Sequence, residues 1–241
     1  PKPRRRGIYV LPNLFTTAAL FGGFYAIVMA MNERFEHAAV AIFVAMVLDG
    51  ADGRIARLTN TQSDFGAEYD SLSDVVSFGI APALVMYQWA LAPMGKLGWI
   101  ASFFYAAATA LRLARFNTQL GVADKRYFQG LPCPAAAGVI AGLLWVGGEQ
   151  ELSGPDVAPV ALVALVFSGA LMVSNVRFNS FKEFDLKGRM PFVMTLAIVL
   201  VMAAVSYDPP IVLFAVFALY ALSGPCMTLV QIRRRRAERH S

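Results

Sequence analysis

The sequence predicts an all-α protein, a polytopic bundle of about eight transmembrane helices with both termini in the cytoplasm. Hydrophobic residues make up 57% of the chain and charged residues 15%, whereas an average soluble domain carries about 25% charge. Several apolar stretches reach the roughly 17–25 residues that a spanning helix needs, and none alternates with period two as a barrel strand does. We therefore expect a single integral-membrane domain over residues 1–241.

Breaks at polar, Gly or Pro clusters divide the chain into eight expected spans. They cover residues 10–31, 36–57, 70–91, 97–116, 133–148, 157–176, 190–207 and 209–231. The fifth is short and interrupted by Pro and Gly, and a four-residue break separates the last two, so six or seven spans remain alternatives. Residues 117–131 form a loop of about fifteen residues, which is long enough to expect a function for it.

The distribution of Lys and Arg indicates the orientation, because cytoplasmic loops collect these residues. With a cytoplasmic amino terminus, all of the 21 Lys and Arg residues except Arg34 and Lys96 fall on the cytoplasmic side. The basic run 233–236 directly follows the last span, so we expect it to contact anionic membrane lipids rather than nucleic acid.

Four aspartates lie where one apolar span ends and the next begins. Asp49 and Asp52 close the second span, and Asp70 and Asp74 open the third. An acid near the bilayer centre costs about 2.5–3.5 kcal/mol on insertion scales, so four acids require a cation, a partner or a water-filled cavity. Helical spacings of three and four residues place each pair on one face. Oxygen donors without Cys or His favour Mg²⁺, Mn²⁺ or Ca²⁺, either as two ions or as one ion beside a protonated acid.

The residues around these acids indicate a phosphate ligand. Gly53 removes a side chain near the face of Asp52, which lets a ligand or a helix approach the backbone, and Arg54 and Arg57 supply positive charge for phosphate oxygens. Two metal ions suit a diphosphate because they bind both the attacked phosphoryl group and the leaving oxygen. A cation transporter is the alternative from another class. It is disfavoured because the acids have no counterpart later in the chain.

The pattern D-x2-D-G-x2-A-R-x8-G-x3-D-x3-D is complete in residues 49–74. It resembles the signature of the CDP-alcohol phosphotransferases, membrane enzymes that transfer a phosphoalcohol group from a CDP-linked donor and release CMP. The resemblance implies two divalent ions, Mg²⁺ or Mn²⁺, with Ca²⁺ as a bound substitute. It implies metal binding by Asp49, Asp52, Asp70 and Asp74, with Asp74 as the general base.

The same resemblance implies a set of contacts with the CDP group. These contacts fall on Asn13, Thr16, Gly53, Ala56, Arg57 and Gly66. The first two belong to residues 11–16, which resemble a short amino-terminal element of the family.

The acceptor alcohol needs separate evidence, because the family uses choline, ethanolamine, inositol phosphates, glycerol phosphate and serine. Arg112 and Arg115 end the fourth span, where they can bind a carboxylate in a bidentate way, bind a phosphate, or anchor the helix. Residues 111–117, 127–136 and 174–178 resemble segments of the bacterial phosphatidylserine synthases of the integral-membrane type.

Two residues of these segments depart from the expected pattern. Cys133 replaces a small hydroxyl residue, and Phe178 stands where Tyr is common. Neither position belongs to the acidic pattern, so both bear on the acceptor rather than on the metal site.

This second resemblance implies that CDP-diacylglycerol and L-serine react to give phosphatidylserine and CMP. It implies serine or phosphate binding by Arg112, Arg115, Asn117 and Arg177. It also implies a homodimer in the bacterial inner membrane with its active site facing the cytoplasm. Because the acidic pattern holds no nucleophilic Cys, Ser or His, we expect direct displacement rather than a covalent intermediate. A sister transferase that uses glycerol 3-phosphate or an inositol phosphate is the alternative.

Overall fold

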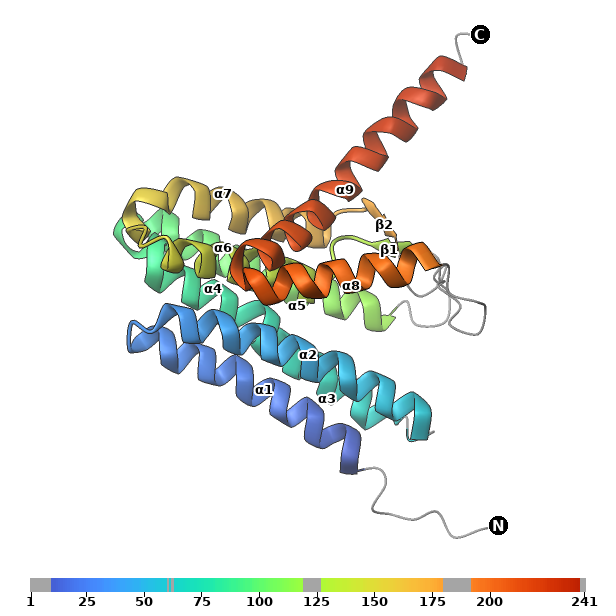
Figure 1. Ribbon diagram of the computed structural model, residues 1–241, viewed down its shortest axis with the longest axis horizontal. Coiled ribbons are helices and arrows are strands. Elements are labelled where there is room, and N and C mark those ends of the chain that lie inside the picture. Colours follow the sequence, from blue (N-terminus) through green and yellow to red (C-terminus); the bar gives the residue numbers. More distant parts are fainter. Residues whose placement is uncertain (1–9, 60, 62, 119–126, 180–191, 239–241) are drawn as a thin grey trace.

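The helices pack into a bundle that carries one short pair of strands, as the computed structural model shows (Figure 1). The structure describes residues 10–59, 61, 63–118, 127–179 and 192–238. The α-helices are α1 Val10–Met31, α2 Phe35–Thr59, α3 Asp64–Asp74, α4 Ala81–Met86, α5 Lys96–Thr118, α6 Cys133–Glu149, α7 Gly154–Val173, α8 Phe192–Tyr207 and α9 Pro209–Glu238. The strands are β1 Tyr127–Gln129 and β2 Arg177–Asn179. The predicted helical class is thus confirmed in these ranges, and the strand pair is an addition that we did not predict.

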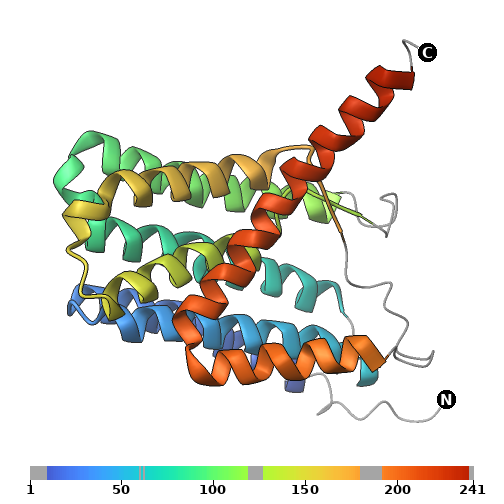
Figure 2. The same cartoon turned by 45° about the horizontal axis from the view of Figure 1, so that its top comes forward.

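From α1 to α7 the chain runs up and down the bundle, with α3 and α4 as parts of one continuous helix, so the connections between spans alternate between its two ends (Figure 1, Figure 2). The turns from α1 to α2 and from α6 to α7 lie at one end. The end of α2, the start of α3 and the two strands lie at the other end. Figure 2 also shows the carboxyl-terminal part of α9 leaving the bundle. The helix ends that carry the acidic pattern are therefore on the same side as the strand pair.

Five helical stretches are long and apolar enough to cross a membrane. They are Pro12–Met31, Asp64–Met94, Lys96–Thr118, Gly154–Val173 and Pro209–Thr228. α6 is apolar but has 17 residues, α8 has 16, and α2 carries charged residues in its last turns. All eight predicted spans correspond to helices, and five of them indicate a membrane protein by length and composition. The exact number of spans stays a prediction.

The helix that carries Asp70 and Asp74 begins earlier than the sequence indicated. It starts at Asp64 because the Ser63 hydroxyl caps it, accepting a hydrogen bond from the Gly66 amide at 3.1 Å. Ser at this position satisfies one of the amides that a helix start leaves without a partner.

The same helix continues beyond Asp74 with changes of winding. π-Helical segments cover Val75–Ile80 and Tyr87–Leu91, with α4 between them, and a 3₁₀ turn covers Ala92–Met94. Single π-turns inside helices are often found at functional sites. The first π-helical segment follows directly after Asp74, so it determines how the following turns are oriented relative to this acid.

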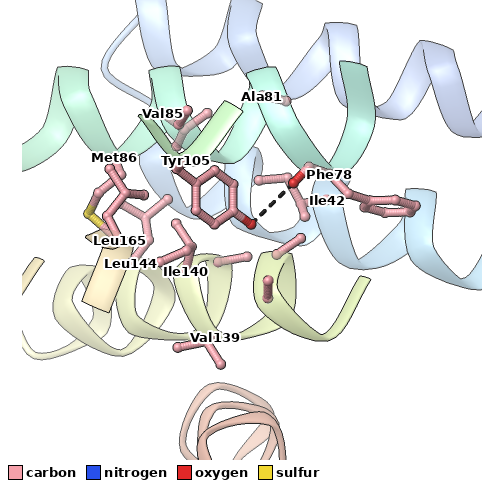
Figure 3. Packing of buried hydrophobic residues seen from close by; sticks show 14 of the residues in the cluster. Ile42, Phe78, Ala81, Val85, Met86, Tyr105, Val139, Ile140, Leu144 and Leu165 are labelled. Carbon is pink, nitrogen blue, oxygen red and sulfur yellow. Dashed lines mark hydrogen bonds between the residues drawn. The ribbon is translucent and has the colours of Figure 1, made fainter. Parts of the chain in front are cut away.

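The side chain of Tyr105, on α5, lies in the core among residues of α4 and α6 (Figure 3). Its side chain is fully buried, as are Val85, Met86 and Ile140 nearby. The Tyr105 hydroxyl donates a hydrogen bond to the carbonyl oxygen of Phe78 at 3.1 Å, which satisfies the one polar group of this side chain. Because Phe78 belongs to the first π-helical segment, this bond ties α5 to the helix of the acids.

Glycines let α6 and α9 approach closely. A Cβ atom on Gly138 would lie 2.6 Å from the ring of Phe217, and one on Gly142 would lie 2.8 Å from the Cα of Phe214. Small residues at such contacts are the usual way in which membrane helices pack, because they bring the two backbones together. α6 is thereby fixed between α2 and α9.

The strand pair connects the segment before α6 to the segment after α7. β1 and β2 are antiparallel, with Phe128 opposite Phe178. Beyond β1, the amide of Gly130 donates to the carbonyl of Val176 at 2.9 Å. Gly130 has a φ of +75°, and a Cβ atom there would collide with the carbonyl of Met172, so glycine is required at this turn. The end of the predicted functional loop is thus held against α7, whereas its residues 119–126 lie outside the described ranges.

Candidate active site

Three of the four predicted metal ligands meet between α2 and α3. One carboxylate oxygen each of Asp49, Asp70 and Asp74 lies within 4.8 Å of the other two. The Oδ1 atom of Asp70 is buried and has no hydrogen-bond partner among the residues that the structure describes. A buried carboxylate oxygen without a partner is costly unless a cation binds it. The donor set therefore fits a hard divalent ion such as Mg²⁺ or Mn²⁺.

Asp52 does not belong to this group of three. It lies one helical turn after Asp49 and is buried, and its Oδ2 accepts a hydrogen bond of 2.6 Å from the hydroxyl of Thr16 on α1. The Asp52 carboxylate is therefore oriented by a side chain of α1. The structure directs the Thr16 hydroxyl at Asp52, and the expected contact between Thr16 and CDP stays a prediction.

Serine hydroxyls hold the helix of the acids against α1. Ser73 donates to the carbonyl of Thr16 at 3.2 Å, and Ser77, one turn later, donates to the carbonyl of Ala19 at 3.0 Å. All four residues are buried, so both bonds are shielded from water and membrane lipid. The two contacts fix where Asp70 and Asp74 lie relative to Asp52. The sequence reasoning assigned no role to these serines, although their spacing of four residues places them on one helix face.

The predicted CDP contacts surround an open surface beside the acids. A Cβ atom on Gly53 would meet a single neighbour, the Nη1 atom of Arg57, at 3.9 Å. Ala56 is half-buried and Arg57 is exposed. Across from them, a Cβ atom on Gly66 would lie 3.5 Å from the Oδ1 atom of Asn13. The structure thus leaves room for a ligand at Gly53 and brings Asn13 and Gly66 together.

Arg112 is a buried cation on the α5 side of the site. Its side chain is 9% exposed, and its Nη1 donates to the Sγ atom of Cys133, the first residue of α6, at 3.2 Å. Its Nε is buried without a hydrogen-bond partner in the described part of the chain. Both Arg112 and Asp74 act electrostatically on the Cys133 thiol, which indicates that Arg112 and the carboxylate group lie in the same region of the protein.

Arg115 and Asn117, predicted to bind the acceptor, are engaged with the protein. The Arg115 Nη2 donates to the carbonyl of Val173 at 2.9 Å, and its Nη1 is 3.4 Å from the carbonyl of Ser174. These are the carbonyls at the end of α7, where a cation is favourable. The Asn117 amide donates to the Ser71 hydroxyl at 3.0 Å.

The last residue predicted to bind the acceptor is Arg177. Its backbone belongs to β2, where it lies opposite Gln129. Its side chain lies outside the described residues.

Fold and site together define a class of protein. The protein is a membrane-type helical bundle in which carboxylates from two helices gather beside an open surface flanked by arginine. This is the architecture expected of a metal-dependent phosphotransferase. The family model of the CDP-alcohol phosphatidyltransferases matches residues 9–174, and the chain belongs to this family. The resemblance found in residues 49–74 is thereby confirmed.

Curated proteins with related sequences include several whose names refer to serine. The CDP-diacylglycerol–serine O-phosphatidyltransferase of Helicobacter pylori is 39% identical over 176 residues, which are 73% of this chain and 74% of that protein. The protein of the same name from Mycobacterium tuberculosis is 42% identical over 152 residues, 59% of this chain and 52% of that protein. The archaetidylserine synthase of Methanothermobacter thermautotrophicus is 31% identical over 170 residues, 70% of this chain and 69% of that protein.

Proposed function

We propose that the chain is a CDP-diacylglycerol–serine O-phosphatidyltransferase. It transfers the phosphatidyl group of CDP-diacylglycerol to the hydroxyl of L-serine and releases CMP. The observation that carries the proposal is the group formed by Asp49, Asp70 and Asp74, within a chain whose curated relatives are named for this reaction.

The carboxylates hold the metal. Asp49, Asp70 and Asp74 bind Mg²⁺ or Mn²⁺, with Ca²⁺ as a bound substitute, and Asp52 completes a site for two ions in the orientation that Thr16 gives it. When bound, the ions neutralise the charge of the diphosphate and of the departing CMP.

The residues near Gly53 bind the CDP group of the donor. The open space at Gly53 admits the diphosphate close to the α2 backbone, Arg57 pairs with a phosphate oxygen, and Ala56, Gly66, Asn13 and Thr16 line the nucleotide. Such positioning and charge stabilisation account for most of the catalysis in phosphoryl transfer.

The reaction is a direct displacement. The serine hydroxyl oxygen forms a bond with the lipid-linked phosphorus, and the bond from that phosphorus to the bridging oxygen of CMP breaks. Asp74 accepts the proton of the hydroxyl during the attack. Its position at the end of α3, beside the carboxylates of Asp49 and Asp70, supports this role.

Arg112 binds the carboxylate of serine. Its buried guanidinium retains a donor without a hydrogen-bond partner in the described ranges, and a carboxylate matches its planar geometry. α6 begins beside it with no side chain capping the first amides, and a free helix start also favours an anion. Arg115 and Asn117 act by holding α7 and α3 in place, and Arg177 is a further candidate for binding phosphate.

The chain works as one integral-membrane domain. With the amino terminus in the cytoplasm, the skew of Lys and Arg places the acidic pattern at the cytoplasmic face of the bacterial inner membrane. There the site takes a lipid donor from the bilayer and serine from water. We further propose eight spans and a homodimer, the assembly that the family resemblance implies.

The test is CMP release from CDP-diacylglycerol by the purified protein with Mn²⁺ or Mg²⁺. L-Serine, glycerol 3-phosphate, an inositol phosphate and no acceptor are compared, each with and without chelator. Release that requires both serine and metal supports the proposal. Release with glycerol 3-phosphate or the inositol phosphate instead would support the metal site but contradict serine as the acceptor. Release without metal would contradict the assignment of the metal site.

A further inference from the structure

Cys133 and Arg112 form a buried pair, and the proposed reaction gives a role to Arg112 but none to Cys133. The Cys133 side chain is fully buried at the start of α6, and its Sγ atom accepts from the Arg112 Nη1 at 3.2 Å. Arg112 is 9% exposed, and its Nε has no hydrogen-bond partner within the described residues. A buried cation is here held by a neutral sulfur.

The chemistry of the two groups explains what this contact does. A thiol is a weak acceptor, whereas a guanidinium carries five N–H donors in one rigid plane. One contact at Nη1 fixes the direction of that plane and leaves the Nε donor without a partner within the described residues. Burial makes such donors costly to leave without a partner, so the pair is arranged to receive a stronger acceptor.

The backbone around the pair is rigid. Arg112 lies on α5 and Cys133 on α6. Leu131, two residues before the thiol, donates its amide to the carbonyl of Leu171 on α7 at 3.0 Å. A side chain mounted on fixed helices orients a ligand-binding group better than one on a free loop.

We propose that Cys133 is a positioning residue for the acceptor: its thiol sets the direction of the Arg112 guanidinium and leaves the Nε donor for the acceptor's carboxylate. This inference rests on the proposed function. Cys133 stands where the family resemblance predicted a small hydroxyl residue. The inference gives this difference a role in acceptor recognition, because Cys133 acts through Arg112 and does not contact the reacting atoms.

Two matched pairs of variants separate positioning from packing. Cys133→Thr and Cys133→Val have nearly the same volume, but only Thr retains an acceptor for Arg112. Cys133→Ser and Cys133→Ala repeat the comparison with smaller side chains, in case the branched residues do not fit. Thermal unfolding in detergent identifies any variant that does not fold. Cys226→Ser, at the exposed second cysteine on α9, is the control for loss of a thiol.

We expect the variants without an acceptor to raise the KM for L-serine about five- to tenfold relative to their matched partners, the factor that loss of one hydrogen bond typically gives. The values of kcat and of the KM for CDP-diacylglycerol should change by less than about twofold, because Cys133 acts on the acceptor alone. A packing role would reverse the order, with Val and Ala tolerated better than Thr and Ser, and that order would overturn the proposal.

A double-mutant cycle with Arg112→Lys tests the link between the two residues. If Cys133 acts through the guanidinium, Cys133→Val should add less than about twofold to the serine KM once Arg112 is Lys, whereas independent effects would multiply. Independent effects would therefore contradict the proposal. Serine-dependent CMP release by the unmodified protein, with equal KM values across the matched pairs, would overturn this inference alone. Absence of serine-dependent release would overturn the proposed function, and this inference with it.

Discussion

The two sides of the candidate site are built in opposite ways. On the α1–α3 side, hydroxyl groups hold the acids in place: Thr16 donates to Asp52, and Ser73 donates to the α1 backbone. On the α5–α7 side, the buried Arg112 meets a thiol and retains an Nε atom without a partner in the described ranges. The protein itself thus orients Asp52 and the helix of the acids, whereas Arg112 keeps hydrogen-bonding capacity in reserve. On the acidic side, the buried atom without a described partner is Asp70 Oδ1, where the metal is proposed to bind.

Two arginines on α5 repeat this contrast within one helical turn. Arg115 gives its donors to the carbonyls at the end of α7, whereas the partner of Arg112 among the described residues is the Cys133 thiol. The same residue type, three positions apart, therefore stabilises the fold at one position and is available to a ligand at the other. Partners, rather than residue type, distinguish the two roles, and the following predictions test that distinction.

The largest effect is expected on the acidic side, from Asp70→Asn. The change removes the negative charge from a carboxylate whose Oδ1 is buried without a described partner, so metal binding should fail. Activity should fall by more than about a hundredfold, since even the outer partners of metal ligands cost 10–100-fold. CMP release in the presence of saturating Mn²⁺ measures it. Asp64→Asn, at an exposed acid of the same helix, is the control, and full turnover by Asp70→Asn would refute the metal assignment.

The next effect is expected from Arg112→Ala on the basic side. Loss of a hydrogen-bonded charge should raise the KM for L-serine about 10- to 100-fold. The KM for CDP-diacylglycerol should stay nearly constant, because the donor binds on the α2 side. Steady-state kinetics in mixed micelles gives both constants. An equal rise in both would mean that Arg112 holds the lipid phosphate instead.

A smaller effect is expected from Thr16→Val, which removes the hydroxyl that orients Asp52. The Mn²⁺ concentration for half-maximal activity should rise about tenfold, the lower range for loss of a group that orients a metal ligand. A metal titration of CMP release measures this shift. Thr109→Val removes a similarly buried hydroxyl that bonds to Tyr105 on its own helix and should leave the titration unchanged. If the two variants behave alike, Thr16 does not act through Asp52.

The local pattern of the sequence predicted the parts of the site that depend on helix geometry. Spacings of three and four residues placed the aspartates on common faces, and the structure brings three of them together. Contacts between distant segments were not predictable in this way. Thr16 lies 36 residues from Asp52, and Arg115 lies 58 residues from Val173. Which partner each side chain meets depends on how the helices pack, and single-helix periodicity does not contain that information.

Two features of the fold differ from the prediction because they depend on short signals or on distant contacts. The helix of Asp70 begins at Asp64 because a serine cap, a short polar signal, extends it beyond the apolar run from which its start was predicted. The strand pair forms because Gly130 permits a turn that collides with α7 for any other residue. Neither strand is long enough to show an alternating pattern, since each has three residues.

The smallest effect on activity is expected from Arg115→Met, which completes the comparison of the two arginines. This change keeps a long apolar side chain but leaves the carbonyls of Val173 and Ser174 without their cation. The free energy of unfolding should fall by about 1–3 kcal/mol, whereas the KM for L-serine should change by less than about twofold, because the guanidinium is already engaged. Thermal unfolding in detergent and the serine KM are measured on the same preparation.

Arg34→Met, at an exposed arginine, is the control and should alter neither quantity, since such surface changes usually stay within about 0.5 kcal/mol. A stable Arg115→Met protein with a strongly raised serine KM would move acceptor binding from Arg112 to Arg115.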